Sequence, residues 1–337
     1  MSGPFFSVIV IAYDRNQFLE SALNSVINQT LSRELFEILL VTNLEIDAHF
    51  TEMRNIRVRH SEFKEIGKKV AMALSDCHGE VICLLDDDDE WFPEKLERMY
   101  SVFCENPKID YCHHFMAFVD VNGKDINPRG QLASWKEEAG EVIWLQPLSG
   151  RKPQGNVSSI LSFNSSCVCI RKSMLVRYSG YLERIKRSVD KFLFYAAVTN
   201  DSGIYSCATE LTRYRVHKSV SSIYTISDFK AFCLKQGENT SKYFEDFSVI
   251  HDMCQQFGAY KLEPEVRTVR AWFKFNSDLF RFKSRRILTQ DFIVNLKLGL
   301  SDRLYDRWMM IILLLSLASL ILPDLPRHFI FNYYNNS

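Results

Sequence analysis

The sequence lacks an excess of charge of either sign. Its 337 residues include 41 Lys and Arg and 41 Asp and Glu, so the formal net charge is +0. Proteins that bind nucleic acids present a basic surface, and this balance therefore argues against a nucleic-acid partner. The length suits one large α/β domain with a smaller appendage, and the hydrophobic content of 47% is that of a folded globular protein.

Paired cysteines and a leading basic segment are also missing. The nine cysteines are odd in number and form no Cys-x-x-Cys pair, and the closest two, Cys167 and Cys169, are spaced as neighbours on a strand. This pattern favours free buried thiols in a reducing compartment over a disulfide framework. Residues 1–10 run directly into an apolar stretch, so we expect no secretory signal and a cytoplasmic location.

Strands and helices alternate through the first hundred residues. Continuous apolar runs predict strands that are buried on both faces, and apolar residues at helical spacing predict helices between them. The predicted strands are Phe6–Ala12, Phe36–Val41, Ile56–Val58 and Val81–Leu85, and the predicted helices are Arg15–Gln29 (capped by Asp14 or Asn16), Ile66–Leu74 and a third that begins at Pro93. This alternation predicts an α/β fold with a doubly wound, mostly parallel sheet that is flanked by helices.

The pattern changes after Val119. Residues 124–160 contain Gly, Pro, Trp and Ser without a clear period, and we expect a loop-rich insertion over the site. The later predicted elements are a strand at Cys167–Ile170, a helix at Val189–Val198, strands at Ile204–Cys207 and Leu211–Val216, and helices from Ile226 onward.

Four consecutive carboxylates follow the fourth predicted strand, in the segment VICLLDDDDEWFP. Residues Asp86–Asp89 repel one another, which raises the local free energy unless a cation neutralises them. Oxygen ligands of this kind suit Mg²⁺ or Mn²⁺, and both ions also bind phosphate. In an extended stretch Asp86 and Asp88 point the same way and Asp87 is opposed, which suits one carboxylate on a ribose hydroxyl and another on a metal. The alternative is a solvated acidic loop that caps the helix at Pro93.

Two other polar segments, Tyr13–Arg15 and Thr42–Asn43, also follow predicted strands. Ligands of doubly wound sheets bind beyond the carboxyl ends of the strands, so these segments and the acidic run are expected to line one site.

Four segments, taken together and in this order, resemble family-two glycosyltransferases of the GT-A fold over roughly residues 5–220. They read SVIVIAYDRNQFLESALNSVINQTL, GEVICLLDDDDEWFPEKLE, IRKSMLVRYSGYLE and ELTRYRVHKSVSS. The resemblance implies an inverting transfer of a sugar from a UDP- or GDP-sugar to a hydroxyl acceptor, with Mn²⁺ or Mg²⁺ as the cofactor. Two family elements differ: Thr42-Asn43-Leu44-Glu45 stands where Asp-Asp-Gly-Ser is usual, and Ala71–Ala73 stands where Ala-Arg-Asn is usual.

The resemblance also implies roles for particular residues. Asp88 and His217 are expected to bind the metal, and Asp190 is expected to be the catalytic base, although it follows Val189 where the family has a Glu-Asp pair. His217 has alternatives, contact with the diphosphate or a structural role, and Asp190 has one, a first-turn helix acid. The expected donor-binding residues are Ala12, Tyr13, Asp14, Arg15, Asn43, Asp86, Asp87 and Arg215, of which Arg215 contacts phosphate or pairs with the acidic run.

The C-terminal third has a different character. Residues 308–322 are uncharged and almost entirely apolar, and residues 265–307 contain ten Lys and Arg against five Asp and Glu. This combination favours a tail that associates with anionic lipid on the cytoplasmic face of a membrane, although fifteen residues are short for a span. The alternative is a helix that packs on a partner in a homo-oligomer. We divide the chain into a glycosyltransferase domain at 1–225, a helical extension at 226–300 and an apolar tail at 301–337.

The acceptor is then expected to be a glycan or a lipid-linked sugar. A nucleotidyltransferase is a competing reading, but the loop AYDRNQF after the first strand has no glycine to hold a triphosphate. A second alternative is a nucleotide-sugar-binding scaffold without catalysis, since Asn43, Ala73 and Val189 replace family residues.

Overall fold

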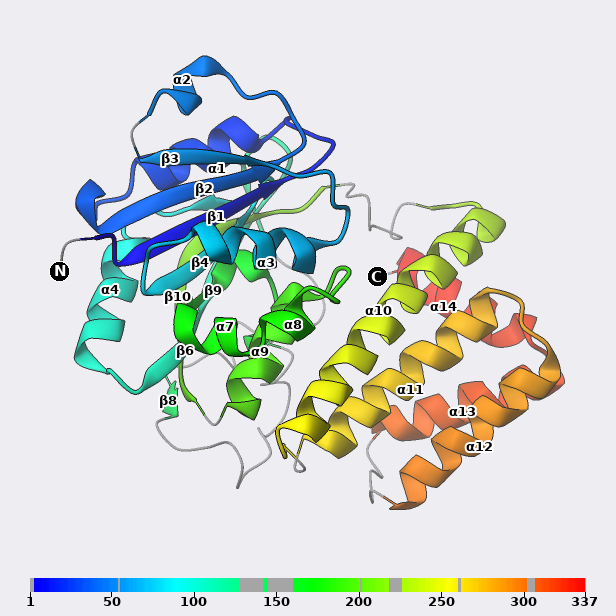
Figure 1. Cartoon of the computed structure of the whole chain (residues 1–337). Coiled ribbons are helices and arrows are strands. Elements are labelled where there is room, and N and C mark those ends of the chain that lie inside the picture. Colours follow the sequence, from blue (N-terminus) through cyan, green and yellow to red (C-terminus); the bar gives the residue numbers. More distant parts are fainter. Residues whose placement is uncertain are drawn as a thin grey trace. The chain divides into compact units, whose positions relative to one another are not determined.

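Two compact units, Met1–His217 and Lys218–Ser337, make up the chain in the computed structural model (Figure 1). The structure describes residues 3–53, 55–127, 142–144, 160–200, 202–217, 226–259, 262–301 and 307–336. Most of the predicted insertion at 124–160 lies outside these residues. The separate assignment of 226–300 and 301–337 to two domains stays a prediction.

One mixed sheet organises the first unit. Its described strands run in the order β3-β2-β1-β4-β9-β6-β10-β5, with β7 beside β6 and β8 beside β10. Strands β3, β2, β1 and β4 pair in parallel, as do β6 and β10, whereas the short strands pair antiparallel. This arrangement confirms the expected α/β class. The strands are β1 (Phe6–Ala12), β2 (Phe36–Thr42), β3 (Ile56–His60), β4 (Val81–Asp86), β5 (Glu90–Trp91), β6 (Ile109–Val119), β7 (Asp125–Ile126), β8 (Val142–Trp144), β9 (Val168–Arg171) and β10 (Gly203–Arg215).

Helices cover both faces of the parallel strands. Every residue of β1 is buried, because alternate side chains pack on opposite layers. Val8 and Val10 join a core with Leu23 and Val26 of α1 (Leu19–Ile27), while α3 (Ile66–Asp76) lies on the face that is nearer the viewer in Figure 1. The other helices of this unit are α2 (Ala48–Thr51), α4 (Lys95–Glu105), α7 (Lys172–Arg177), α8 (Ser179–Leu182) and α9 (Val189–Thr199), with 3₁₀ turns η1 (Arg33–Leu35) and η3 (Ser165–Cys167).

Three predicted elements differ from those found. The first helix begins at Leu19 rather than Arg15, and neither Asp14 nor Asn16 caps it with a side chain. Residues 13–18 form a turn instead, in which Asp14 adopts a positive φ of 58°. The two predicted closing strands are one strand, β10, whose pairing with β6 shifts register between Cys207 and Thr212. This irregularity interrupts the apolar alternation and explains the apparent gap.

The cysteines are free, and eight of the nine are buried. Cys83 and Cys169 lie opposite each other on β4 and β9, and Cys112 of β6 is the next partner of Cys169. Their burial among apolar side chains raises the pKa of the Cys112 thiol well above its usual value. They act as small core residues in the sheet.

Helices account for the regular structure described in the second unit. They are α10 (Phe229–Gln256), α11 (Glu263–Phe280), α12 (Arg285–Ser301), α13 (Arg307–Ile321) and α14 (Asp324–Asn336). Phe232, Phe275, Phe280 and Leu288 form its core with Ile330. The apolar segment predicted at 308–322 is α13. Within the described residues, none of the helices has both the length and the apolar character that crossing a membrane requires.

A glycine just before β4 lets this strand approach β1 closely. A Cβ on Gly79 would meet the backbone nitrogen of Ser7 and the carbonyl carbon of Phe6, and the Gly79 amide donates to Ser7 Oγ at 2.8 Å. We expect Gly79→Ala to lower the free energy of unfolding by about 1–3 kcal/mol in urea denaturation, because the added methyl overpacks the sheet. Gly180→Ala is the control, since nothing lies within 4 Å of its Cβ position. Equal stability of the two variants would contradict this explanation.

Candidate active site

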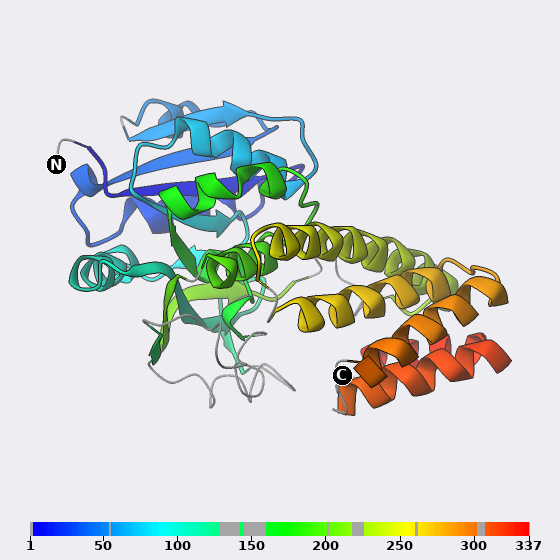
Figure 2. The ribbon, with the colours of Figure 1, turned by 60° about the horizontal axis from the view of Figure 1, so that its bottom comes forward.

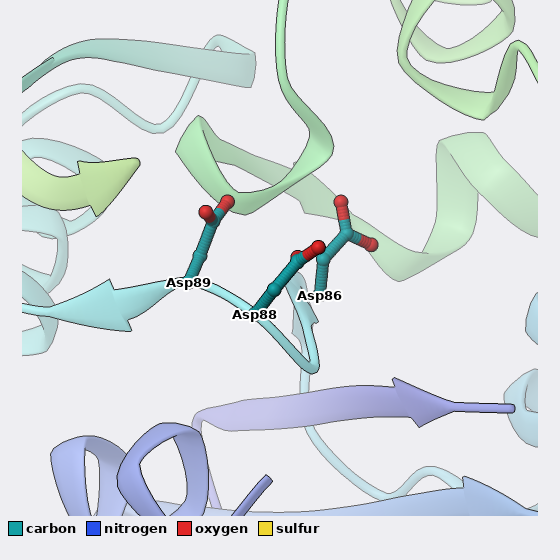
Figure 3. Close-up of side chains that lie close together, drawn as sticks. All are labelled: Asp86, Asp88 and Asp89. Atoms are coloured by element: carbon teal, nitrogen blue, oxygen red, sulfur yellow. The ribbon is translucent and has the colours of Figure 1, made fainter. Parts of the chain in front are cut away.

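The acidic run forms a tight turn at the end of β4. The strand stops at Asp86, and the amide of Asp89 donates to the Asp86 carbonyl at 3.2 Å. As Figure 3 shows, Asp86, Asp88 and Asp89 place their carboxylates on the same side of the turn, and one oxygen of each lies within 4.8 Å of the others. The expected grouping of Asp86 with Asp88 is thus found, but a turn produces it rather than strand alternation, and the turn adds Asp89.

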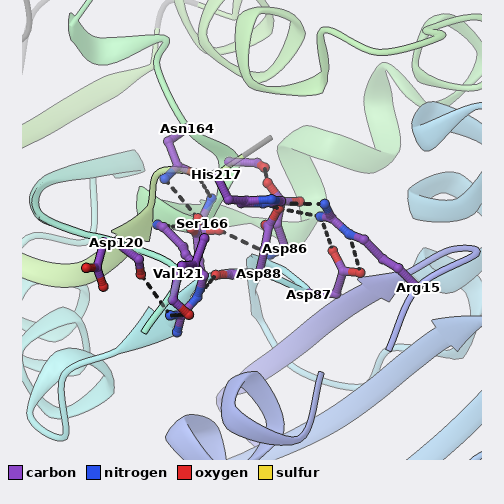
Figure 4. A network of polar contacts seen from close by, with 12 residues as sticks. Arg15, Asp86, Asp87, Asp88, Asp120, Val121, Asn164, Ser166 and His217 are labelled. Atoms are coloured by element: carbon purple, nitrogen blue, oxygen red, sulfur yellow. Dashed lines mark hydrogen bonds and ion pairs between the residues drawn. The ribbon is translucent and has the colours of Figure 1, made fainter. Parts of the chain in front are cut away.

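Arg15 follows β1 and His217 follows β10, and the side chains of both residues reach this turn (Figure 4). The Arg15 guanidinium makes two bonds to Asp87, Nε to Oδ2 at 2.9 Å and Nη2 to Oδ1 at 2.6 Å. The same Nη2 donates to Asp88 Oδ2, which also lies 2.8 Å from His217 Nε2. Asp87 is therefore held by Arg15. Asp88 bonds both Arg15 and His217 and also belongs to the acidic cluster.

A short segment before β9 supplies neutral hydrogen bonds to the same turn. Asn164 Nδ2 donates to Asp89 Oδ2 at 3.0 Å, and Ser165 Oγ donates to Asp86 Oδ2 at 2.9 Å. The Asp86 amide donates to Ser166 Oγ at 3.1 Å. Asn164 has a positive φ of 64°, a region that asparagine tolerates better than most residues. None of these three residues is among the site residues expected from the sequence.

Three side chains donate hydrogen bonds to the carbonyl of Ser166 and so fix the position of this segment. The carbonyl accepts from Lys95 Nζ at 2.6 Å, from Trp91 Nε1 at 3.0 Å and from Thr212 Oγ1 at 3.0 Å. Lys95 is fully buried, and burial lowers the pKa of its ammonium group. Trp91, Lys95 and Thr212 all belong to sequence segments that carry the family resemblance. In the structure they fix the position of residues 164–166, which in turn bond the aspartates.

Arg215, the last residue of β10, bonds the acidic turn and the glutamate that follows it. Its amide donates to Asp89 Oδ1 at 3.1 Å, and its Nε donates to the Asp88 carbonyl at 3.1 Å. The guanidinium also forms an ion pair with Glu90 and donates to the Asp120 carbonyl at 3.1 Å. The ion pair is thus with Glu90, the residue after the acidic run, and the contact of Arg215 with phosphate stays a prediction.

The first two strand ends also meet. Asn43 Oδ1 accepts from the Asp14 amide at 3.0 Å, and Asn43 Nδ2 donates to Asp14 Oδ1 at 2.7 Å. This pairing holds the turn that follows Ala12 against the end of β2. Ala12 itself is buried at the end of β1, and Tyr13 is half-buried beside it. The predicted donor-binding residues of the two segments are thus neighbours.

Lys69 is a further cation at this edge, and sequence reasoning missed it. It belongs to α3 and is only 3% exposed, with its Nζ 4.0 Å from the centre of the Tyr13 ring. Burial lowers the pKa of Lys69 to about 8, against the opposing effect of Asp87, Asp14 and Asp86. A lysine on the apolar inner face of a predicted amphipathic helix was the available signal.

Asp190 lies in the first turn of α9, as predicted. Its Oδ1 accepts from the Lys191 amide at 2.8 Å, and its Oδ2 lies 3.9 Å from Lys191 Nζ. Among the described residues, no hydrogen bond or ion pair joins Asp190 to the acidic run. Its catalytic role stays a prediction.

Crowding and burial change the proton affinity of the cluster. Burial, followed by the charges of Asp88 and Asp89, raises the pKa of Asp86 well above its usual range. Burial and the charge of Asp88 raise the pKa of Asp89 to about 7, although Asn164 and the Arg215 amide bond its ionised form. Three carboxylates are thus held together with too little positive charge to keep all of them ionised, which is the electrostatic setting that a bound cation relieves.

The geometry is accompanied by a clear family match. Residues 7–177 match the family model of glycosyl transferase family 2. The matched segment is more than half of the chain, which therefore belongs to glycosyl transferase family 2. This confirms the resemblance inferred from the four sequence segments.

Two curated relatives that are named as glycosyltransferases match at modest identity. EpsH of Bacillus subtilis (strain 168), named as a glycosyltransferase, is 25% identical over 226 residues, which cover 65% of this chain and 63% of EpsH. The uncharacterized glycosyltransferase alr2836 of Nostoc sp. (strain PCC 7120) is 30% identical over 160 residues, which cover 43% of this chain and 49% of the relative. The chain thus spans less than two thirds of the length of these relatives.

The fold is shared with TarS of S. aureus. The crystal structure of TarS residues 1–349 in complex with UDP-GlcNAc matches with a TM-score of 0.52 at 16% identity, covering 84% of this chain and 83% of that chain. At this identity the likeness concerns the fold alone, and it confirms the GT-A-type architecture.

The raised carboxyl pKa values predict how pH affects stability. The folded protein holds a proton on Asp89 up to about pH 7, whereas an unfolded aspartate releases it near its ordinary pKa of 3.8. The folded state therefore binds more protons between these values, and the cation-free protein should lose stability as pH rises from about 4 to about 7. Thermal melts of this chain and of Asp89→Asn across this range isolate the effect, and the same pH dependence in both proteins would contradict it.

Proposed function

We propose that this chain transfers a sugar from a nucleotide-sugar donor to a hydroxyl group of an acceptor, with inversion at the anomeric carbon. The observation that carries the proposal is the cluster of Asp86, Asp88 and Asp89 at the end of a central parallel strand, with Arg15 beside it. Sites of doubly wound sheets lie at this edge. Membership of glycosyl transferase family 2 supports the reaction class, and the complex of TarS with UDP-GlcNAc supports a UDP-sugar as the donor, with a GDP-sugar as the alternative.

The residues present fit a Mn²⁺ or Mg²⁺ ion. Carboxylate oxygens are the ligands that these hard cations prefer, and three of them converge here. His217 Nε2 and Asp88 Oδ2 are 2.8 Å apart. The imidazole therefore lies within reach of a cation that Asp88 would hold. Asp88 and His217 are the proposed ligands, and Asp86 is proposed to face the ribose or the sugar.

The protein's own residues then have distinct tasks. A bound cation would neutralise charge on the diphosphate as it leaves. Arg15 keeps its two bonds to Asp87 and thereby stays at the site as a second positive charge. Asp14 and Asn43 hold each other at the neighbouring strand ends, where the nucleoside is proposed to bind. In an inverting transfer a carboxylate accepts the proton of the attacking hydroxyl, and Asp190 is the proposed acceptor of that proton.

The acceptor is proposed to be a glycan or a lipid-linked sugar that is handled at the cytoplasmic face of a membrane. Support comes from the second unit, where residues 265–307 carry ten Lys and Arg against five Asp and Glu and α13 is apolar. Such a composition suits anionic lipid surfaces.

Substitution of Asp88 and Asp190 tests the transfer. We expect Asp88→Asn to lower the turnover of the donor by about 10²–10³-fold, because charge on the leaving diphosphate is no longer balanced. Asp190→Asn should lower it by about 10²–10⁴-fold through loss of the base. The measurement is release of nucleoside diphosphate from UDP- and GDP-sugars with Mn²⁺ and a panel of acceptors. Asp125→Asn, an exposed carboxylate on β7, is the control.

Two results would change the assignment. Turnover of Asp190→Asn within about twofold of the unsubstituted protein would remove this residue as the base. Tight donor binding without turnover on any acceptor would support the scaffold reading in place of the enzyme.

Substitutions of Lys69 and of its neighbour Lys68 form a matched pair that tests whether Lys69 belongs to the donor site. The ammonium group is charged below its pKa of about 8 and neutral above it, so affinity for a nucleoside diphosphate should fall as pH rises through 8. We expect Lys69→Gln to weaken binding about tenfold at pH 7 and to remove this pH dependence. Lys68→Gln, which removes a half-buried lysine paired with Glu65, should do neither. Calorimetric titration of UDP and GDP measures both, and equal effects of the two substitutions would exclude Lys69 from the donor site.

A further inference from the structure

The connection between α11 and α12 exposes an aromatic ring among basic side chains. Phe282 is 53% exposed and has a φ of 55°, a conformation that a bulky residue seldom adopts. The Arg327 guanidinium lies 4.1 Å from the centre of its ring and holds it in place. The basic residues around this ring are all exposed: Arg281, Lys283, Arg285 and Arg286.

The connection between α13 and α14 lies beside it. Arg285 Nη2 donates to the Ile321 carbonyl at 3.4 Å, and Figures 1 and 2 both show the two connections at the same end of the helical unit. Ile321, Leu322 and Leu325 are 67%, 61% and 58% exposed. Together with Phe282 and the four basic residues, they form one surface, here called the basic-apolar patch.

The patch continues along the outer face of α13. Ile311, Leu314 and Leu317 recur at helical spacing and are 40%, 61% and 46% exposed. The opposite face is buried, with Ser316 accepting from Asn295 Nδ2 of α12 at 3.2 Å. A helix on a water-facing surface normally presents polar residues outward, whereas α13 presents leucine and isoleucine. Fifteen residues extend about 22 Å, which suits a helix lying along an interface.

We propose that the basic-apolar patch docks the chain on a membrane surface that contains anionic lipids. The apolar side chains would enter the boundary between headgroups and acyl chains, and the four basic residues would contact lipid phosphates. Asp324, the acid between Leu322 and Leu325 in the sequence, is already paired with Arg327 at 2.6 Å and leaves the charge of the four basic residues unbalanced.

Charge also favours a membrane over a second copy of the chain. A two-fold interface between copies brings the same patch of each copy together. Arg281, Lys283, Arg285 and Arg286 would then share one interface with the same four residues of the partner, and the like charges would repel each other. The patch belongs to the helical unit, so this inference goes beyond sugar transfer and is independent of the aspartate cluster.

Binding of the full chain to vesicles tests the proposal. We expect the protein to co-sediment with vesicles of phosphatidylcholine plus phosphatidylglycerol, more weakly with phosphatidylcholine alone, and less at high salt. Lys283→Gln with Arg286→Gln should lower the partition coefficient on the anionic vesicles about 25-fold, since each basic residue contributes about fivefold. Leu322→Glu with Leu325→Glu should lower it more than about tenfold on either lipid.

Val176→Glu is the matched control, because Val176 is 49% exposed on α7 of the other unit. It should bind vesicles as the unsubstituted chain does. Melting curves establish that each variant folds, and if the leucine variant does not, the charge variant on the exposed connection still decides. Vesicle binding that neither pair of substitutions reduces would overturn the proposal. So would a dimer in sedimentation that Leu322→Glu with Leu325→Glu converts to monomer without vesicle binding by the parent chain, since the patch would then be an interface between copies.

Discussion

Repulsion among the carboxylates of Asp86, Asp88 and Asp89 is the constraint around which the first unit is arranged. One oxygen from each lies within 4.8 Å of the others, and Asp89 is buried. Such a cluster persists only where donors surround it. The segment at 164–166 gives neutral hydrogen bonds from one side, Arg15 gives charge from another, and the end of β10 gives a backbone amide. Segments from widely separated parts of the chain must therefore be in place before this turn is stable.

Much of this arrangement could be predicted from the sequence. The run Phe6–Ala12 is β1 residue for residue, because a strand buried on both faces must be continuously apolar. The acidic run could be identified because carboxylates that are adjacent in the sequence repel one another in any fold. The register shift in β10 and the positive φ of Asn164 could not be predicted, since both result from tertiary contacts that override local preference. Lys69 was missed for a different reason. It lies on the inner face of α3, where buried residues are usually apolar core residues.

Arg15 shows how the site can hold its charges both with and without a ligand. Its guanidinium bonds Asp87 through two nitrogens and reaches Asp88 through one of them. A cation bound at the cluster, as proposed, would compete with Arg15 only for Asp88, so the arginine would lose one bond and keep two. The bidentate pair with Asp87 fixes the side chain in either case. A lysine at this position could not do the same, because its ammonium group cannot form the planar two-nitrogen pair with one carboxylate that fixes Arg15.

The same reasoning explains why Asp87 differs from its neighbours. All four aspartates carry the same group, but the turn sends Asp87 to Arg15 and gathers the other three. Burial raises the pKa of Asp87, and the Arg15 bonds oppose that shift. Asp89 has no comparable cation, and its pKa reaches about 7. Chemically identical residues thus have different partners: Asp87 anchors Arg15, Asp88 shares that arginine with His217, and Asp86 and Asp89 are bonded by neutral donors. This division follows from the direction in which one tight turn points each side chain.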